Sequence, residues 1–178
     1  MEEPAITIHT YDAQAPQCAP GDPEAPAAAS VLARFLRDQL TGTAIEHIGS
    51  TAVSGCAGKG IVDLMVLYAE GQLPAVREKI DALGFQRQTT REPFPEERPM
   101  RTGAFDFQGR RYQVHVHVVA AGSTEAADTL YFRDCLRADS ELRAAYVAYK
   151  KKILASGVSD SVDYAIAKGE FIRQCLGH

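Results

Sequence analysis

The stretch Glu46–Val66 reads EHIGSTAVSGCAGKGIVDLMV, and it carries the strongest indication of the fold. An apolar run ends in a Gly-Ser-Thr turn, and a loop of small residues leads through Lys59 into a second apolar run. The second run contains one carboxylate, Asp63, between apolar neighbours. A charge on a buried strand costs several kcal/mol unless it is paired or bound to a metal. The stretch therefore predicts two strands joined by a polar turn, with Asp63 in a pairing or ligating role.

The composition is that of an ordinary globular protein. A chain of 178 residues with a formal charge of -4 is expected to form a single domain and gives no reason to expect nucleic-acid or membrane binding. No apolar run approaches the ~20 residues of a membrane span, and the acidic start MEEP is unlike a signal peptide. We therefore expect a cytoplasmic protein whose partner is a small molecule or nucleotide. Oligomeric state has no signal in the sequence.

Periodicity along the rest of the chain predicts an α/β (α+β) fold, with a mixed sheet followed by helices. Apolar residues at helical spacing, period-two strands and glycine or proline stops mark the elements. They are strands at 5–9, 44–48, 60–67 (buried on both faces), 104–108 and 111–119, helices at 28–40 and 72–83, an exposed loop at 89–103, and three helices after 124 broken near 139–140 and 156–158. One domain, 1–178, would then comprise an irregular lead-in (1–27), a sheet-containing core (28–122) and C-terminal helices (123–178).

The Gly49-Ser50-Thr51 turn is a candidate phosphate site. Glycine permits a tight turn, and the following hydroxyls and amides can hold phosphate oxygens. The same residues are also typical of a simple turn in which a hydroxyl caps a short helix.

The pair His115 and His117 is a candidate metal site. Residues two apart on a strand point to the same face, so both imidazoles should lie on one side of the sheet. Together with Asp63 they form a possible set of two histidines and one carboxylate, which suits Zn²⁺, Mn²⁺ or Fe²⁺ better than Mg²⁺. The alternatives are hydrogen-bonded histidines in a core or cleft, and an Asp63 paired with Lys59 or with an arginine at the strand end.

Several segments together resemble the GrpB family, also called UPF0157. The segments are HIGSTAV with the small loop and the strand bearing Asp63, then HVHVV, FRDCLR, AAYVAYKKKIL and Lys168 with Phe171-Ile172, within residues 43–175. The resemblance implies a nucleotidyltransferase-like mixed sheet flanked by helices, with a helical C-terminal third. It also implies a nucleotide-binding cleft and transfer of a nucleotidyl group to a small molecule.

The sequence departs from the superfamily pattern at the acids. Gly49-Ser50 and Asp63 have the superfamily spacing, but Met65 stands where a second acid is expected, and His115 or His117 where a third is expected. Two-metal phosphoryl chemistry depends on bridging carboxylates, which one aspartate cannot readily supply. Ser54 and Gly60 also replace prolines of the family, which loosens the loop before Lys59.

Three hypotheses follow for the function. The first is a nucleotidyltransferase using Mg²⁺ or Mn²⁺, the second is a His-Asp site for Zn²⁺, Mn²⁺ or Fe²⁺ with hydrolase or other metal-assisted activity, and the third is a catalytically silent anion-binding module. Lys150–Lys152 could instead be a solvated helix face, and Arg133 could form an ion pair with Asp134. The candidate residues are Asp63 and Lys59 (catalytic), Gly49, Ser50, Thr51, His47, Arg133, Lys150 and Lys168 (substrate-binding), and Asp63, His115 and His117 (metal), with His47 a possible further ligand.

Overall fold

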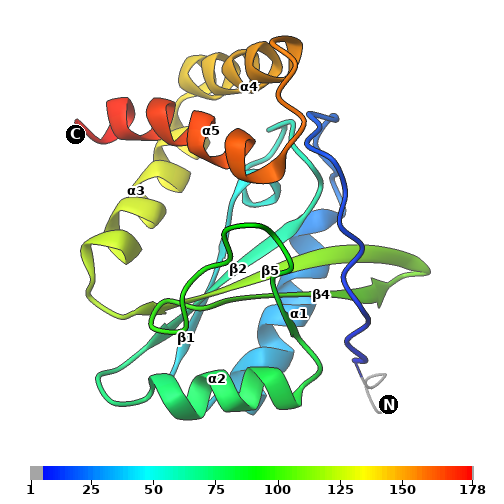
Figure 1. Cartoon of the computed structure of the whole chain (residues 1–178), viewed down its shortest axis with the longest axis vertical. Coiled ribbons are helices and arrows are strands. Elements are labelled where there is room, and N and C mark those ends of the chain that lie inside the picture. The colour runs from blue at the N-terminus through cyan, green and yellow to red at the C-terminus, as the bar shows by residue number, and fades with distance from the viewer. Residues whose placement is uncertain (1–5, 178) are drawn as a thin grey trace.

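A computed structural model describes residues 6–177, and its centre is a five-stranded mixed sheet in the order β1-β2-β5-β4-β3 (Figure 1). Only β2 and β5 are parallel, and the other neighbours are antiparallel. The strands are β1 (Ala44–Ile48), β2 (Val62–Tyr68), β3 (Gln86–Arg87), β4 (Met100–Phe107) and β5 (Arg110–Ala120).

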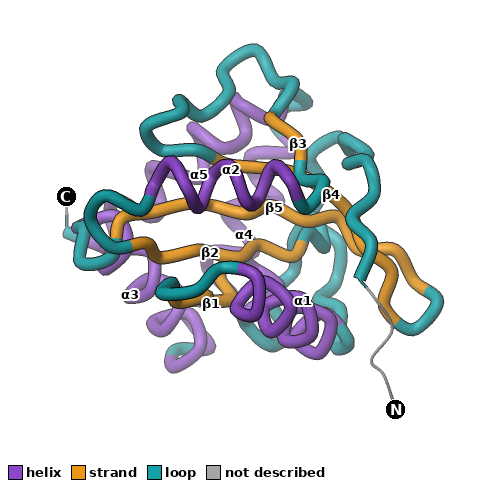
Figure 2. The backbone as a smooth tube through the Cα atoms, turned by 90° about the horizontal axis from the view of Figure 1, so that it is seen from below, coloured by secondary structure: helices purple, strands orange, loops and turns teal. Residues whose placement is uncertain are grey.

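Within residues 6–177, five helices flank this sheet. Helix α1 packs across β1 and β2 (Figures 1 and 2). The three C-terminal helices gather on the side away from α2 (Figure 1). A short 3-10 helix, η1 (Ser50–Ala52), follows β1. The helices are α1 (Ala25–Gln39), α2 (Leu73–Ala82), α3 (Thr124–Ala138), α4 (Ser140–Ala155) and α5 (Ser161–Leu176). Among the described residues, none of the helices has the length and apolar character needed to cross a membrane.

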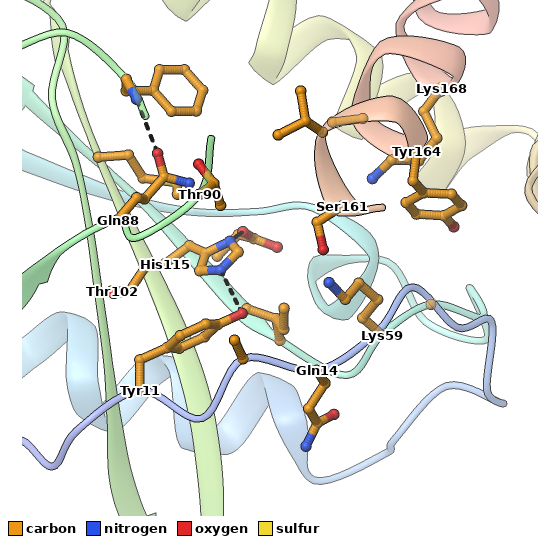
Figure 3. A pocket seen from close by; sticks show the side chains of 18 of the residues that line it. Tyr11, Gln14, Lys59, Gln88, Thr90, Thr102, His115, Ser161, Tyr164 and Lys168 are labelled. Atoms are coloured by element: carbon orange, nitrogen blue, oxygen red, sulfur yellow. Dashed lines mark hydrogen bonds and ion pairs between the residues drawn. The ribbon is translucent and has the colours of Figure 1, made fainter. Parts of the chain in front are cut away.

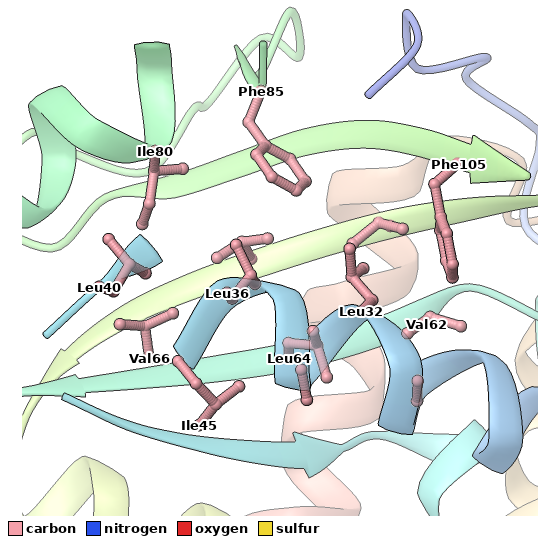
Figure 4. Packing of buried hydrophobic residues seen from close by; sticks show 14 of the residues in the cluster. Leu32, Leu36, Leu40, Ile45, Val62, Leu64, Val66, Ile80, Phe85 and Phe105 are labelled. Carbon is pink, nitrogen blue, oxygen red and sulfur yellow. The ribbon is translucent and has the colours of Figure 1, made fainter. Parts of the chain in front are cut away.

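The main core lies between the sheet and the helices α1 and α2. Leu32 and Leu36 of α1 lie among the side chains of Leu64 and Val66 (Figure 4), and all four are fully buried. Burial of a leucine or valine side chain contributes about 1.5–3 kcal/mol, so this layer holds the sheet in place. Because strand side chains alternate, the residues between them on β2 point to the opposite face.

The register of β2 against β5 decides which side chains share that opposite face. Asp63 pairs with His115 and Met65 with His117, while their neighbours face α1. The prediction that both histidines lie on one side of the sheet is confirmed.

The expected α/β class is confirmed, as are strand 44–48 and the three C-terminal helices. Two element predictions are wrong. Of the strand predicted at 5–9, Ala5 lies outside the described residues and the rest makes only an isolated bridge from His9 to Ala104. The loop predicted at 89–103 ends earlier, because Met100–Gly103 form buried strand.

The reason for the second error is Arg101. Its charge suggested an exposed loop, yet its side chain is 1% exposed because Asp81 and Glu96 bind the guanidinium. The strand at 60–67 begins at Val62, and only one of its faces is wholly apolar, since Asp63 is 22% exposed on the other.

Candidate metal and anion-binding site

A cavity of about 460 Å³ opens on the face of the sheet opposite α1. Its walls are the N-terminal segment at 11–14, the loop before β2, the segment 88–94 and the first turns of α5 (Figure 3). Seven of the candidate residues line it: Ser50, Lys59, Asp63, His115, His117, Lys150 and Lys168.

Asp63, His115 and His117 lie together at the floor of this cavity. Asp63 Oδ1 is 3.2 Å from His115 Nδ1 and 3.6 Å from His117 Nε2. One ligand atom from each of the three residues lies within 4.8 Å of the others. A tetrahedral ion with bonds of about 2.1 Å holds its ligand atoms roughly 3.4 Å apart. The two separations that involve Asp63 bracket that value, and one carboxylate with two imidazoles is a donor set for a transition-metal ion.

Tyr11 completes the environment of His115. The Tyr11 hydroxyl is 3.1 Å from His115 Nε2, and the two rings pack at 5.3 Å between centroids. Burial and the nearby charge of Asp63 raise the pKa of Tyr11 to about 12, so its hydroxyl keeps its hydrogen. The Tyr11 hydroxyl therefore lies within hydrogen-bond distance of Nε2, while His115 Nδ1 faces the Asp63 carboxylate at 3.2 Å.

Arg98 holds the outer nitrogen of His117. Arg98 Nη1 is 3.2 Å from His117 Nδ1, and a guanidinium can only donate hydrogen bonds. The neutral His117 ring thus accepts at Nδ1 and carries its hydrogen on Nε2, facing Asp63. Glu125 anchors Arg98 through Nε at 2.7 Å and through Nη2.

The electrostatics keep Asp63 ionised. Burial alone would raise the pKa of Asp63, but the hydrogen bonds and charges of His115 and His117 hold it well below its ordinary value. Burial lowers the pKa of His117, against the opposing effect of Asp63. The site therefore brings one carboxylate anion together with two imidazoles, which is a donor set that transition metals take.

Three lysines face this set, and they differ in their partners. Lys59 and Lys168 point into the cavity from the loop before β2 and from α5 (Figure 3). Within residues 6–177, neither ammonium forms a hydrogen bond or an ion pair; Lys168 only lies over the Tyr164 ring at 4.7 Å. Burial lowers the pKa of Lys59 and lowers that of Lys168 to about 8, despite the attraction of Asp63.

Lys150, in contrast, binds other groups of the protein. Its side chain is 1% exposed, so the suggestion of a solvated helix face is wrong at this position, although Lys151 and Lys152 are exposed. Its ammonium donates to Ser50 Oγ at 3.1 Å and to the Ala57 carbonyl, and lies 3.8 Å from Cys56 Sγ. Lys150 thus joins α4 to two points, Ser50 and Ala57, of the loop between β1 and β2.

The Gly-Ser-Thr turn lies beside Asp63, but only Ser50 of the three lines the cavity. Thr51 donates to the Ile61 carbonyl at 3.1 Å and accepts from His47 Nε2 at 2.9 Å. Burial lowers the pKa of His47 to about 4, so this ring is neutral. His47 and Thr51 therefore fasten β1 to the start of β2, and they do not line the cavity.

Gly49 is required by its backbone and by its neighbour. Its φ of 73° and ψ of -172° are almost exclusive to glycine, and a Cβ there would lie 2.5 Å from Asp63 Oδ2. We expect Gly49→Ala to lower the free energy of unfolding by about 2 kcal/mol, as measured by urea denaturation, and to displace the Asp63 carboxylate. Gly55→Ala is the control, because Gly55 has the same φ but nothing within 4 Å. Equal losses in both variants would mean that contact with Asp63 is irrelevant.

Arg133 lies behind the site. Its guanidinium binds Glu46 Oε2 at 2.8 Å, the His47 carbonyl at 3.1 Å and Asp134 Oδ1 at 2.8 Å. These contacts join α3 to β1, and Arg133 does not line the cavity. The alternative prediction, an ion pair between Arg133 and Asp134, is the one that the structure has.

The sequence-based reasoning missed the two residues that, within residues 6–177, hydrogen-bond to the histidines. Tyr11 lies in an irregular segment and Arg98 in a loop rich in charges and prolines, so neither had a periodic or motif signal. The pairing of Asp63 with Lys59 is not found: no ion pair joins them, and both histidines face the cavity.

Comparison with known proteins places the chain in a family. A family model described as GrpB protein matches residues 16–178. A UPF0157 protein of Streptomyces coelicolor is 38% identical over 128 residues, covering 72% of this chain and 64% of the relative. A UPF0157 protein of Pseudomonas aeruginosa is 30% identical over 168 residues, covering 89% of this chain and 65% of the relative. The chain thus spans slightly less than two thirds of the length of each.

Solved structures with a similar fold include the conserved protein GrpB from Enterococcus faecalis, with a TM-score of 0.61 and 21% identity over 90% of this chain and 99% of that one. Cid1 in complex with its short product ApU matches with a TM-score of 0.49 and 19% identity over 74% of this chain and 41% of that one. The family model covers nearly the whole of the described chain, including every residue of the floor of the cavity. The chain belongs to the GrpB family.

Proposed function

We propose that the cavity binds a phosphate-bearing small molecule, in the first instance a nucleotide, together with a divalent transition-metal ion on Asp63, His115 and His117. The observation that carries the proposal is the pairing of this donor set with two lysine ammoniums that lack a carboxylate partner among residues 6–177. Apart from Asp63, the only acid lining the cavity within those residues is the exposed Glu92. Lysines without counter-charges in a partly buried space favour an anionic ligand.

The residues have distinct roles in this proposal. Lys59 and Lys168 bind the phosphate oxygens and stabilise the negative charge that develops as a phosphorus–oxygen bond breaks. Asp63, His115 and His117 hold the metal, which when bound polarises a phosphate oxygen or a water. Nucleotidyl transfer to a small molecule is the reaction that the resemblance of the Gly49-Ser50 and Asp63 pattern to nucleotidyltransferases implies.

The donor set argues for a transition metal over Mg²⁺. Mg²⁺ prefers oxygen ligands in octahedral geometry, and imidazole nitrogen suits Zn²⁺, Mn²⁺ or Fe²⁺. Met65 occupies the position of a second acid and is fully buried on β2, so it supplies no oxygen. A pair of Mg²⁺ ions bridged by carboxylates therefore does not fit these residues.

Thermal unfolding of the metal-stripped protein tests the proposal. We would measure the midpoint with Mg²⁺, Mn²⁺, Zn²⁺ and Ni²⁺, each with and without ATP, GTP, CTP, UTP or pyrophosphate. A ligand at 100 times its dissociation constant stabilises by about 2.7 kcal/mol, which moves the midpoint by several degrees. We expect a rise with a transition metal and a further rise when a nucleotide is added, with turnover followed as released pyrophosphate.

The variants make the result specific. Asp63→Asn and His115→Ala should remove the response to metal, and His9→Gln, a histidine outside the cavity, should keep it. A response that needs Mg²⁺ and nucleotide together would contradict the transition-metal assignment. No response to any metal or phosphate compound would contradict the proposal as a whole.

A further inference from the structure

The two histidines at the floor of the cavity differ in what holds their outer nitrogens. His115 Nε2 meets the hydroxyl of Tyr11, which can donate or accept a hydrogen bond. His117 Nδ1 meets the guanidinium of Arg98, which can only donate. This asymmetry matters when a metal binds.

A metal on Asp63 would take the inner nitrogens, His115 Nδ1 and His117 Nε2, because these face the carboxylate at 3.2 Å and 3.6 Å. A neutral imidazole bound through one nitrogen carries its hydrogen on the other. At His115 that hydrogen would point at the Tyr11 oxygen, which accepts it. At His117 it would point at the Arg98 N–H, so two donors would face each other across the present 3.2 Å.

Arg98 is held firmly in this conflicting position. Glu125 on α3 binds two nitrogens of Arg98. The Arg98 guanidinium also lies 4.6 Å from the centre of the Phe94 ring. The Phe94 ring in turn packs edge-on against His117 at 5.8 Å. In the metal-free site, Arg98 and Tyr11 thus hydrogen-bond to the outer nitrogens of the two histidines, whose inner nitrogens face Asp63. Arg98 also ties the segment 88–99 to the floor of the cavity.

We propose that Arg98 sets the metal affinity of the site, because Arg98 must leave His117 before Asp63, His115 and His117 can all bind one ion. Metal binding then loosens the segment 88–99, of which the part at 88–94 forms one wall of the cavity. This inference rests on the proposed function only in taking those three residues as the metal ligands. It adds a residue that does not touch the metal but determines how tightly the metal is held.

The test compares metal affinities of the purified, metal-stripped protein by calorimetric titration with Zn²⁺ and Mn²⁺. Arg98→Gln replaces the donor by a group that can accept a hydrogen bond from His117 Nδ1, and Arg98→Met removes polar contact altogether. We expect Arg98→Gln to bind metal about 10- to 100-fold more tightly than the wild type, and Arg98→Met to fall between them. Arg91→Gln is the matched control and should leave metal affinity unchanged. Arg91 lies on the same segment, but it pairs with the exposed Asp160 and Asp163 and not with a histidine.

A second measurement separates this role from a merely structural one. Hydrogen exchange of residues 88–99 should speed up when Zn²⁺ is added to the wild type, and should be fast in Arg98→Gln with or without Zn²⁺. Glu125→Gln keeps Arg98 but weakens its anchor, so it should raise metal affinity by a smaller factor even if the Arg98 variants fold poorly.

The outcomes are distinguishable. Equal metal affinity in the wild type, Arg98→Gln and Glu125→Gln would overturn the role of Arg98 and leave the metal site standing. Weaker binding in Arg98→Gln would also overturn it. No metal binding in the wild type or in any of these variants would overturn both this inference and the metal site.

Discussion

Lys150→Met should lower the free energy of unfolding by about 2–3 kcal/mol, as measured by urea denaturation at pH 7. Methionine fills a similar volume but cannot donate a hydrogen bond. The Ser50 hydroxyl and the Ala57 carbonyl would both lose the ammonium that now binds them. A buried polar group left without its partner costs about 1–3 kcal/mol. We expect this loss to outweigh the gain from removing the buried charge. Burial already lowers the pKa of Lys150, which shows that the charge itself is disfavoured there.

The control for this variant is Lys151→Met, one residue further along α4. Lys151 is exposed, and exposed substitutions of this kind usually change stability by less than about 0.5 kcal/mol. A Lys150→Met protein as stable as the wild type would mean that the ammonium does not hold the loop. We also expect the variant to weaken the metal response, because the same loop carries Ser50 and passes beside Asp63.

The part of the site that could be predicted is the part governed by strand periodicity. His115 and His117 are two residues apart on a strand, so their shared face followed from backbone geometry alone. Asp63 among apolar neighbours required a partner, and it has two. What the sequence could not show is that β2 and β5 are adjacent and parallel, because pairing depends on the whole sheet. The contact between Asp63 and His115 is a consequence of that register.

The parts that could not be predicted depend on contacts between distant segments. Lys150 stands in a run of three lysines, and nothing local distinguishes the buried one from the two exposed ones. Arg101 is buried because Asp81, twenty residues earlier, and Glu96 converge on it. Tyr11 reaches His115 across 104 residues of sequence. Charge and periodicity within a short stretch of sequence carry no information about partners that lie far away in the chain.

Lys168→Met should have the opposite effect on stability from Lys150→Met. Within residues 6–177 the Lys168 ammonium makes no hydrogen bond, so its removal leaves no group without a partner. Burial lowers its pKa to about 8, which means that folding disfavours the charged form. Each pKa unit corresponds to about 1.4 kcal/mol, and the loss of the contact with the Tyr164 ring opposes the gain. We expect a net stabilisation of about 1–2 kcal/mol at pH 7 by urea denaturation.

The pH dependence identifies the cause of that stabilisation. Between pH 8 and 10.5 the unfolded chain binds more protons at Lys168 than the folded protein, so this residue makes stability rise with pH in that window. Below pH 8 the loss of stability caused by burying the charged Lys168 is fully present and constant. Subtracting the Lys168→Met curve from the wild-type curve cancels the other titrating groups. The difference should therefore shrink steadily from pH 8 to 10.5.

The same variant should bind anions less well. A hydrogen bond to a charged group contributes about 1.5–3 kcal/mol, so the affinity for pyrophosphate or a nucleotide should fall roughly 10- to 100-fold. Lys152→Met, an exposed lysine outside the cavity, is the control and should change neither quantity. A Lys168→Met protein that is both more stable and equally able to bind pyrophosphate would place the anion elsewhere. Higher stability together with weaker binding is the combination expected of a residue kept for its ligand, because the folded protein then retains a charge that only a bound anion compensates.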